Sequence, residues 1–305
     1  MTQTDVFEYD PETLARISAL KIRAVNLVDG LLTGGHRSRH KGSSVEFAEY
    51  KEYSPGDEIR HIDWKVVGKT DKYQVKQFEQ TTNLKCSILL DASGSMTYES
   101  PGKRALTKLE YAKTLSAAFS FLLLKQFDSV GLTLFNDRTL HHIPPRSKPS
   151  HFQHILHGLA TMETGGTTQI AQVVSDLAER LPNRGMVILI SDLLTPDEQL
   201  PKALKLLTSR GLEVMLFQVL DPDEIELPFE GDIIFESLED DPEVNLDPRD
   251  VQAEYQVEMQ ALIKNNREVC KNLGVDYELL DTSTSPGQAL SYFLLKRKNG
   301  AQRWA

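Results

Sequence analysis

The stretch LKCSILLDASGSM, Leu84 to Met96, combines a short apolar run with an abrupt polar turn. The run Ser87–Leu90 ends at Asp91, and two hydroxyl side chains, Ser93 and Ser95, follow at alternate positions. An apolar run of this length before a Gly/Ser turn predicts a fully buried strand followed by a tight loop. Ligands of open α/β sheets bind just beyond the carboxyl ends of strands. We therefore expect a small oxygen-rich site here.

Strand and helix patterns alternate along the chain after this stretch. Apolar runs predict strands over 130–135, 186–190, 212–219 and 275–280, with a short edge strand over 139–143. Helical periodicity occupies 107–126, 149–162, 170–181, 196–209, 249–273 and 287–298. Such alternation is typical of an α/β fold with a doubly wound, mostly parallel sheet flanked by helices. A smaller N-terminal region of one helix and β-strands precedes it.

Two regions are expected from these patterns. Residues 1–82 should form the N-terminal region, with a helix after Asp10, a basic loop at 36–41 and strands near 45–53 and 73–79. Residues 83–298 should form the α/β domain, with an acidic insert at 221–254. The basic loop is either an anion site or a solvated loop. The acidic insert is either a solvated loop or hairpin, or a docking surface for a basic partner.

Composition excludes several classes of function. The chain has 305 residues, a formal net charge of −10 and a pI of about 5.4. Binders of nucleic acid or anionic membranes need a basic surface, so we expect neither as a partner. An apolar signal segment and a membrane-spanning run are absent, which predicts a cytoplasmic protein. Cys86 and Cys270 are interpreted as core residues.

Three predicted loops should meet at one edge of the sheet: 91–95, 166–168 and 191–192. They carry the carboxylates of Asp91 and Asp192 and several hydroxyls, with no nitrogen or sulfur ligand. Such hard oxygen ligands favour Mg²⁺ or Mn²⁺. Because neutral hydroxyls donate little charge, the cation would stay electrophilic. It would keep a position that an Asp or Glu carboxylate of a protein partner can fill.

These residues resemble the metal-ion-dependent adhesion site of von Willebrand factor type A domains. The family motif is Asp-x-Ser-x-Ser, followed by a distant Thr and a distant Asp. It corresponds here to Asp91, Ser93, Ser95, Thr167 and Asp192, with Thr168 as a possible substitute for Thr167. The resemblance implies a metal site in a von Willebrand factor A-like domain.

A second resemblance lies in the N-terminal third. The residues Gly35 to Ser38, Gly42, Glu46-Phe47, Tyr53, Gly56-Asp57 and Arg60 to Trp64 resemble the domain of unknown function 58 family. That family carries such a motif ahead of a type A domain. The resemblance covers about residues 34–220, with departures at Lys51 and Gly68-Lys69. Its members are similar to proteins that work beside MoxR-type AAA+ ATPases, which implies such an ATPase as partner.

Two classes of function follow. The first is a non-enzymatic, Mg²⁺-dependent protein-binding module, an adaptor that acts with the ATPase in assembly or maturation of protein complexes. The alternative is a phosphohydrolase of the haloacid-dehalogenase type with Asp91 as nucleophile, although Ser93 stands where that motif has its second Asp. A serine hydrolase is disfavoured because Ser93 lacks the Gly-x-Ser-x-Gly elbow. The lack of a P-loop argues against an ATPase.

Overall fold

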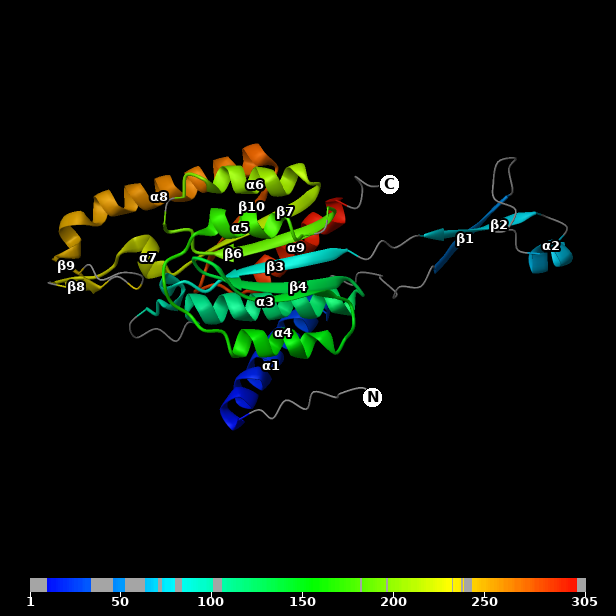
Figure 1. Cartoon of the computed structure of the whole chain (residues 1–305), viewed down its shortest axis with the longest axis horizontal. Coiled ribbons are helices and arrows are strands. Elements are labelled where there is room, and N and C mark those ends of the chain that lie inside the picture. Colours follow the sequence, from blue (N-terminus) through cyan, green and yellow to red (C-terminus); the bar gives the residue numbers. More distant parts are fainter. Residues whose placement is uncertain are drawn as a thin grey trace. The chain divides into compact units, whose positions relative to one another are not determined.

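The computed structural model shows an α/β fold with a mixed central sheet flanked by helices (Figure 1). It describes residues 10–33, 46–52, 64–70, 73–79, 84–100, 106–181, 183–195, 197–231, 233–236, 238 and 243–300. The chain divides into two compact units, one of Met1–Ser38 with Leu84–Ala305 and one of Arg39–Asn83.

The larger unit is built on a six-stranded sheet of order β10-β7-β6-β3-β4-β5. All neighbouring pairs are parallel except β4 and β5, which run antiparallel at the edge. This order reverses direction between β3 and β6, since the chain builds outward from β3 on one side and from β6 on the other. The strands are β3 (Lys85–Asp91), β4 (Ser129–Phe135), β5 (Thr139–Arg146), β6 (Gly185–Ser191), β7 (Leu212–Leu220) and β10 (Asp276–Asp281).

The central strands are apolar along both faces because both faces are covered. In β3, Ile88 and Leu90 belong to one core cluster, and Leu89 between them belongs to the other. Residues 187–190 of β6 and 214–217 of β7 alternate between the two clusters in the same way. This is the reason for the unbroken apolar runs in the sequence.

The helices form a layer on each face of the sheet (Figure 1). Residues of α1, α3, α4 and α9 share the first core cluster, and those of α5, α6 and α8 share the second. Phe119 of α3 packs on Phe217 of β7 and Phe293 of α9, with ring centroids 5.4 and 5.0 Å away. The helices are α1 (Pro11–Thr33), α3 (Lys108–Lys125), α4 (His151–Ala160), α5 (Ile170–Ala178), α6 (Leu200–Ser209), α8 (Pro248–Leu273) and α9 (Gly287–Gly300).

Helix α1 belongs to the α/β unit rather than to the N-terminal region in which the sequence patterns place it, whereas the division after Asn83 lies next to the predicted boundary at residue 82. Ile17, Leu20, Ala24 and Val28 lie on one face of α1 and are buried in the first core cluster. A lone amphipathic helix has to bury this face somewhere, and α3, α4 and α9 supply the surface. Arg23 of α1 also donates to Glu110 of α3 at 2.6 Å, joining the two helices.

The smaller unit contains an antiparallel pair, β1 (Glu46–Glu52) and β2 (Gln74–Glu79), and a short helix, α2 (Trp64–Thr70). The two strands agree with the sequence patterns, whereas α2 was not predicted. The basic loop at 36–41 and most of the family signature between 35 and 63 lie outside the described residues.

The acidic insert contains regular structure in its described parts. A short helix, α7 (Pro222–Glu226), precedes the antiparallel hairpin of β8 (Ile233–Glu236) and β9 (Glu243–Leu246). Helix α8 begins at Pro248, inside the predicted insert, with Asp247 as its N-cap. The hairpin agrees with the predicted loop or hairpin, and the last residues of the predicted insert, 248–254, belong to helix α8.

Gly131 offers a test of how tightly the edge strand β5 is seated. A Cβ at this position would lie 2.7 Å from the Ile143 carbonyl oxygen and 2.8 Å from the Pro145 nitrogen, both backbone atoms of β5. We expect Gly131→Ala to lower the free energy of unfolding by about 1–3 kcal/mol, because overpacking forces the backbone to shift. Urea unfolding measures this change.

The control is Gly30→Ala on α1, where a Cβ would meet no atom within 4 Å. Alanine is the better helix former, so this variant should gain roughly 0.5–1 kcal/mol. Equal stabilities for the two variants would contradict the packing of β5 on β4.

Candidate metal site

The predicted site residues lie at the carboxyl ends of β3 and β6, where the strand order of the sheet reverses. Asp91 is the last residue of β3, and Ser191 is the last residue of β6 with Asp192 directly after it. Neighbouring connections leave in opposite directions at such a point, and the loops diverge to leave a crevice. The third loop, 165–168, arrives from α4 and leads into α5.

Asp91 is the centre of this arrangement. Its side chain is fully buried, and its Oδ1 accepts a hydrogen bond from the Ser93 backbone N–H at 2.9 Å. Its Oδ2 accepts from the hydroxyls of Ser191 at 2.6 Å and Thr168 at 3.2 Å. One carboxylate thereby joins all three loops that the sequence placed at this edge.

Backbone hydrogen bonds hold the first two loops against each other. The Gly94 N–H donates to the Gly166 carbonyl at 3.0 Å, and the Gly165 N–H donates to the Ala92 carbonyl at 3.0 Å. Gly166 has φ +74°, and a Cβ there would lie 3.3 Å from Asn136 Nδ2. Glycine suits this position because it tolerates positive φ without steric penalty.

The two serines present their hydroxyls to each other. Ser93 Oγ and Ser95 Oγ are 3.1 Å apart. Ser93 is also the N-cap of the short 3₁₀ helix Gly94–Thr97, but its side chain makes no capping hydrogen bond. Ser93 is fully buried and Ser95 is half-buried, so Ser95 lies nearer to solvent.

The structure distinguishes between the two adjacent threonines. Thr168 is buried and bonds to Asp91, whereas the Thr167 side chain is exposed. Of the residues assigned to the motif from the sequence, Asp91, Ser93, Ser95 and Asp192 lie on converging loops, and the threonine that donates a hydrogen bond to Asp91 is Thr168. Sequence spacing could not separate the two because both follow Gly166 at the start of a helix.

Asp192 is fixed by backbone and side-chain contacts. It is fully buried, and the Gln218 side-chain amide of β7 donates to its carbonyl at 2.8 Å. The next residue, Leu193, is buried with φ +51°, a strained conformation for a residue with a Cβ. Strain of this kind often occurs at functional sites and costs about 1–3 kcal/mol.

A buried lysine that the sequence patterns did not single out lies beside Asp192. Lys108 Nζ is 2.7 Å from Asp192 Oδ2 and 2.5 Å from Glu224 Oε1, and the lysine side chain is fully buried. In the sequence Lys108 is only one of the residues of the predicted helix 107–126. Thr107 is the N-cap of this helix, since its hydroxyl accepts from the Glu110 N–H at 3.1 Å.

Charge at the site is unbalanced. Burial, and then the nearby charge of Asp192, raise the pKa of Asp91 to about 6. Burial by itself disfavours the ammonium of Lys108, but the carboxylates of Asp192 and Glu224 outweigh it and raise its pKa. Counted as carboxylates, Asp91, Asp192 and Glu224 bring three negative charges against the one ammonium of Lys108, which is a formal charge of −2 for the group.

The donor set fits a hard divalent cation. Carboxylate and hydroxyl oxygens suit Mg²⁺ or Mn²⁺, and a charge of +2 would neutralise the buried group. Among the described residues, no three or more His, Cys, Asp or Glu side chains group as metal ligands. Any cation here would therefore rely on two carboxylates, Asp91 and Asp192, and on hydroxyls.

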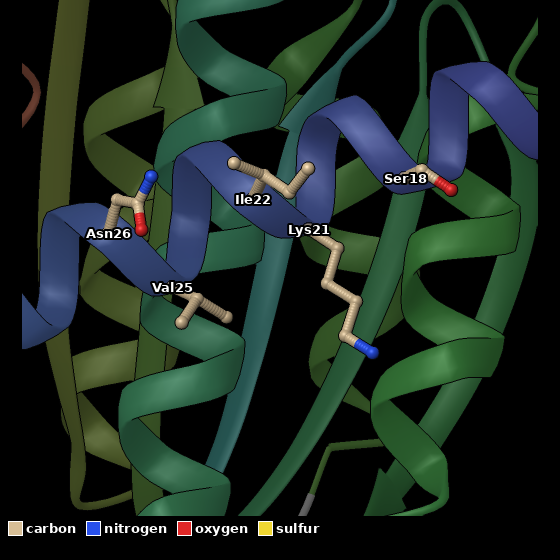
Figure 2. Close-up of a pocket in the computed structure, with 5 residues that line it drawn as sticks. All are labelled: Ser18, Lys21, Ile22, Val25 and Asn26. Carbon is tan, nitrogen blue, oxygen red and sulfur yellow. The ribbon is translucent and has the colours of Figure 1, made fainter.

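A shallow hollow elsewhere on the surface is separate from this site. Figure 2 shows its lining, which comes entirely from α1: Ser18, Lys21, Ile22, Val25 and Asn26. Ile22 is 60% exposed there. None of these residues is on the loops around Asp91.

Comparison with known proteins identifies relatives. A family model described as "Protein of unknown function DUF58" matches residues 49–268. Uncharacterized proteins of Mycobacterium bovis and Mycobacterium tuberculosis are 29% identical over 233 residues, which is 75% of this chain and 72% of theirs.

Solved structures are also among the matches. One is an aerotolerance-related membrane protein from Bacteroides fragilis, at 21% identity and a TM-score of 0.46, covering 70% of this chain and 99% of that one. A second is BatB from Bacteroides thetaiotaomicron, at 18% identity and a TM-score of 0.46. That match covers 71% of this chain and 99% of the other. A third is an uncharacterized membrane-spanning protein from Vibrio fischeri, at 16% identity and a TM-score of 0.24. That match covers 69% of this chain and 96% of the other.

One sequence-based prediction does not agree with these comparisons. The predicted partners were a carboxylate-bearing protein and a MoxR-type ATPase, with nucleic acid and a membrane excluded. Two of the similar structures are of proteins described as membrane proteins, which does not agree with the exclusion of a membrane. Within the described part of this chain itself, every helix is too short or too polar to cross a bilayer.

The raised pKa of Asp91 predicts a pH-dependent stability in the absence of divalent cations. A carboxyl whose pKa is higher in the folded state binds more protons when folded than when unfolded. Its ionisation therefore has no effect on stability below the unfolded pKa of 3.8, destabilises the fold increasingly between pH 3.8 and 6, and destabilises it fully above pH 6. Above pH 6 the ionised carboxylate lowers the free energy of unfolding by about 3 kcal/mol. We expect Asp91→Asn in EDTA to unfold at higher urea than the unmodified chain at pH 7.5.

The difference should be about half as large at pH 5, which lies midway between the unfolded and folded pKa values, so that the native carboxyl is already mostly protonated there. A difference that is unchanged or larger at pH 5 would contradict the burial of an ionised Asp91. Urea titrations at the two pH values provide both numbers.

Proposed function

Because the chain belongs to the DUF58 family, we propose that it is a non-enzymatic, Mg²⁺-dependent protein-binding module with a von Willebrand factor type A fold. The observation that carries this proposal is the convergence of three loops on Asp91, with a second buried carboxylate, Asp192, on one of them. Proteins rarely bury two carboxylates in one site unless a cation or protons compensate them.

In this proposal Asp91, Ser93, Ser95, Thr168 and Asp192 hold the cation, directly or through water. The cation, Mg²⁺ or Mn²⁺, supplies a Lewis-acidic position for an oxygen ligand of the bound protein. The chain's own residues orient that position: the hydrogen bonds to Asp91 fix one carboxylate, and Lys108 and Gln218 fix Asp192. The half-buried Ser95 marks the side from which a protein can approach.

The contacts of Asp91 speak against the alternative, a phosphohydrolase with this residue as nucleophile. Both of its oxygens accept hydrogen bonds inside the protein, and the side chain has no exposed surface. A general acid two residues later would also be needed in that mechanism, and Ser93 occupies the position. Turnover of a phosphomonoester that disappears in Asp91→Asn would restore this alternative.

The first test is calorimetric titration of Mg²⁺ into the full chain. We expect Asp91→Ala to abolish binding while the circular dichroism spectrum stays unchanged, because the site lies at the edge of the sheet. The matched control is Asp137→Ala, an exposed carboxylate in the loop after β4. Unchanged Mg²⁺ affinity in Asp91→Ala would refute the metal assignment.

Protein binding itself is tested by pull-down from a cell lysate in Mg²⁺ and in EDTA. Partners should be retained by the unmodified chain in Mg²⁺ and lost in EDTA, and Asp91→Ala should retain none in either. Identical partners under all four conditions would mean that the site has no part in binding.

The two threonines give a sharper test of the site's composition. Thr168→Val removes a hydroxyl that bonds to Asp91, whereas Thr167→Val removes an exposed hydroxyl one residue away. We expect Thr168→Val to weaken Mg²⁺ binding by about 10- to 100-fold, in the range found when groups that support metal ligands are removed. Thr167→Val should bind Mg²⁺ like the unmodified chain, and the reverse result would restore Thr167 to the site.

A further inference from the structure

The buried ammonium of Lys108 is shared between two carboxylates from different parts of the fold. Asp192 follows β6, and Glu224 lies in α7, within the acidic insert. Lys108 itself begins α3 and has no exposed surface. Lysine is almost never fully buried without charged partners, because its transfer from water is unfavourable. These two contacts therefore hold the ammonium in place.

Glu224 is held firmly on the side away from Lys108. Its second oxygen, Oε2, accepts from the Asp221 backbone N–H at 2.9 Å, which completes the capping box of α7. The Tyr255 hydroxyl of α8 donates to the Glu224 carbonyl at 2.5 Å. Asp221 is anchored in turn by Thr282, whose hydroxyl donates to it at 3.0 Å. Glu224 is thus a fixed anion rather than a mobile surface side chain.

We propose that Glu224, acting through Lys108, sets the cation affinity of the site by drawing the ammonium away from Asp192. This inference rests on the proposed function, because it assigns a role toward the same cation. An ammonium paired with Asp192 alone would neutralise that carboxylate and repel a divalent cation. With Glu224 sharing the ammonium, Asp192 keeps negative charge for the cation. Glu224 and Lys108 are positioning residues in this scheme and do not touch the cation.

The arrangement also couples the site to α7. When a cation binds Asp192, the ammonium of Lys108 interacts more strongly with Glu224, and this stabilises the capping box of α7. Such coupling is reciprocal: if cation binding stabilises α7 by a given factor, displacement of α7 should weaken cation binding by that same factor. The acidic insert thereby acquires a role as a modulator of the site.

The test compares two variants of α7 that lose the same charge. Glu224→Gln keeps the size of the side chain and an oxygen that can accept from Asp221, but no longer attracts Lys108. Glu226→Gln is the control, because Glu226 is exposed on the same helix. By calorimetry we expect Glu224→Gln to bind Mg²⁺ about tenfold more weakly, as for other groups that support a metal ligand. Glu226→Gln should stay within about twofold of the unmodified chain.

A second measurement needs no variant. Hydrogen exchange of the α7 amides of Glu224 and Ile225, which donate to the Asp221 carbonyl at 3.0 and 3.2 Å, should slow when Mg²⁺ is added. Equal Mg²⁺ affinity in Glu224→Gln and the unmodified chain, or unchanged α7 exchange with Mg²⁺ bound, would overturn this inference alone. Absence of Mg²⁺ binding by the unmodified chain would overturn it together with the proposed function.

Discussion

The structure around the sheet edge depends on the burial of Asp91. Its carboxylate has no access to water, and the hydrogen bonds that replace water come from its own loop, from Thr168 and from Ser191. Because each donor arrives from a different loop, the carboxylate fixes the three loops relative to one another. The same burial makes its charge unfavourable, and the pKa of about 6 reflects that cost. A site that is well ordered and carries unfavourable negative charge is suited to a cation.

Lys108 extends this network into the rest of the fold. It compensates part of the negative charge around Asp192 while being tied to α7 through Glu224. A buried ion pair contributes little net stability, since desolvation offsets most of the attraction. Its effect is better described as positional: it determines where the carboxylate of Asp192 lies and how much of its charge remains available. The elements around the site are therefore linked by charge as well as by apolar packing.

Much of the fold could be predicted because the strands are buried on both faces. An unbroken apolar run between two helical segments, such as 186–190, is readily recognised as a buried strand. The strands and helices predicted after residue 84 occur in the structure in the same order. The placement of α1 could not be predicted in this way. Its apolar stripe, with Leu20 and Ala24, shows that it packs on something, but periodicity carries no information about which partner. For that reason the sequence patterns group α1 with residues 1–82, whereas it packs in the larger unit.

The sequence by itself determined the chemistry of the candidate site and its place at strand ends. Asp91, Ser93, Ser95 and Asp192 are fixed by local order, because a residue that follows a buried parallel strand must emerge at the sheet's carboxyl edge. Only the tertiary structure shows that Thr168, rather than Thr167, bonds to Asp91, since that contact depends on which side chain turns inward at the start of α5. Only the tertiary structure brought Lys108 and Glu224, 116 residues apart, to one carboxylate. Contacts between distant segments arise from packing, and no local pattern encodes them.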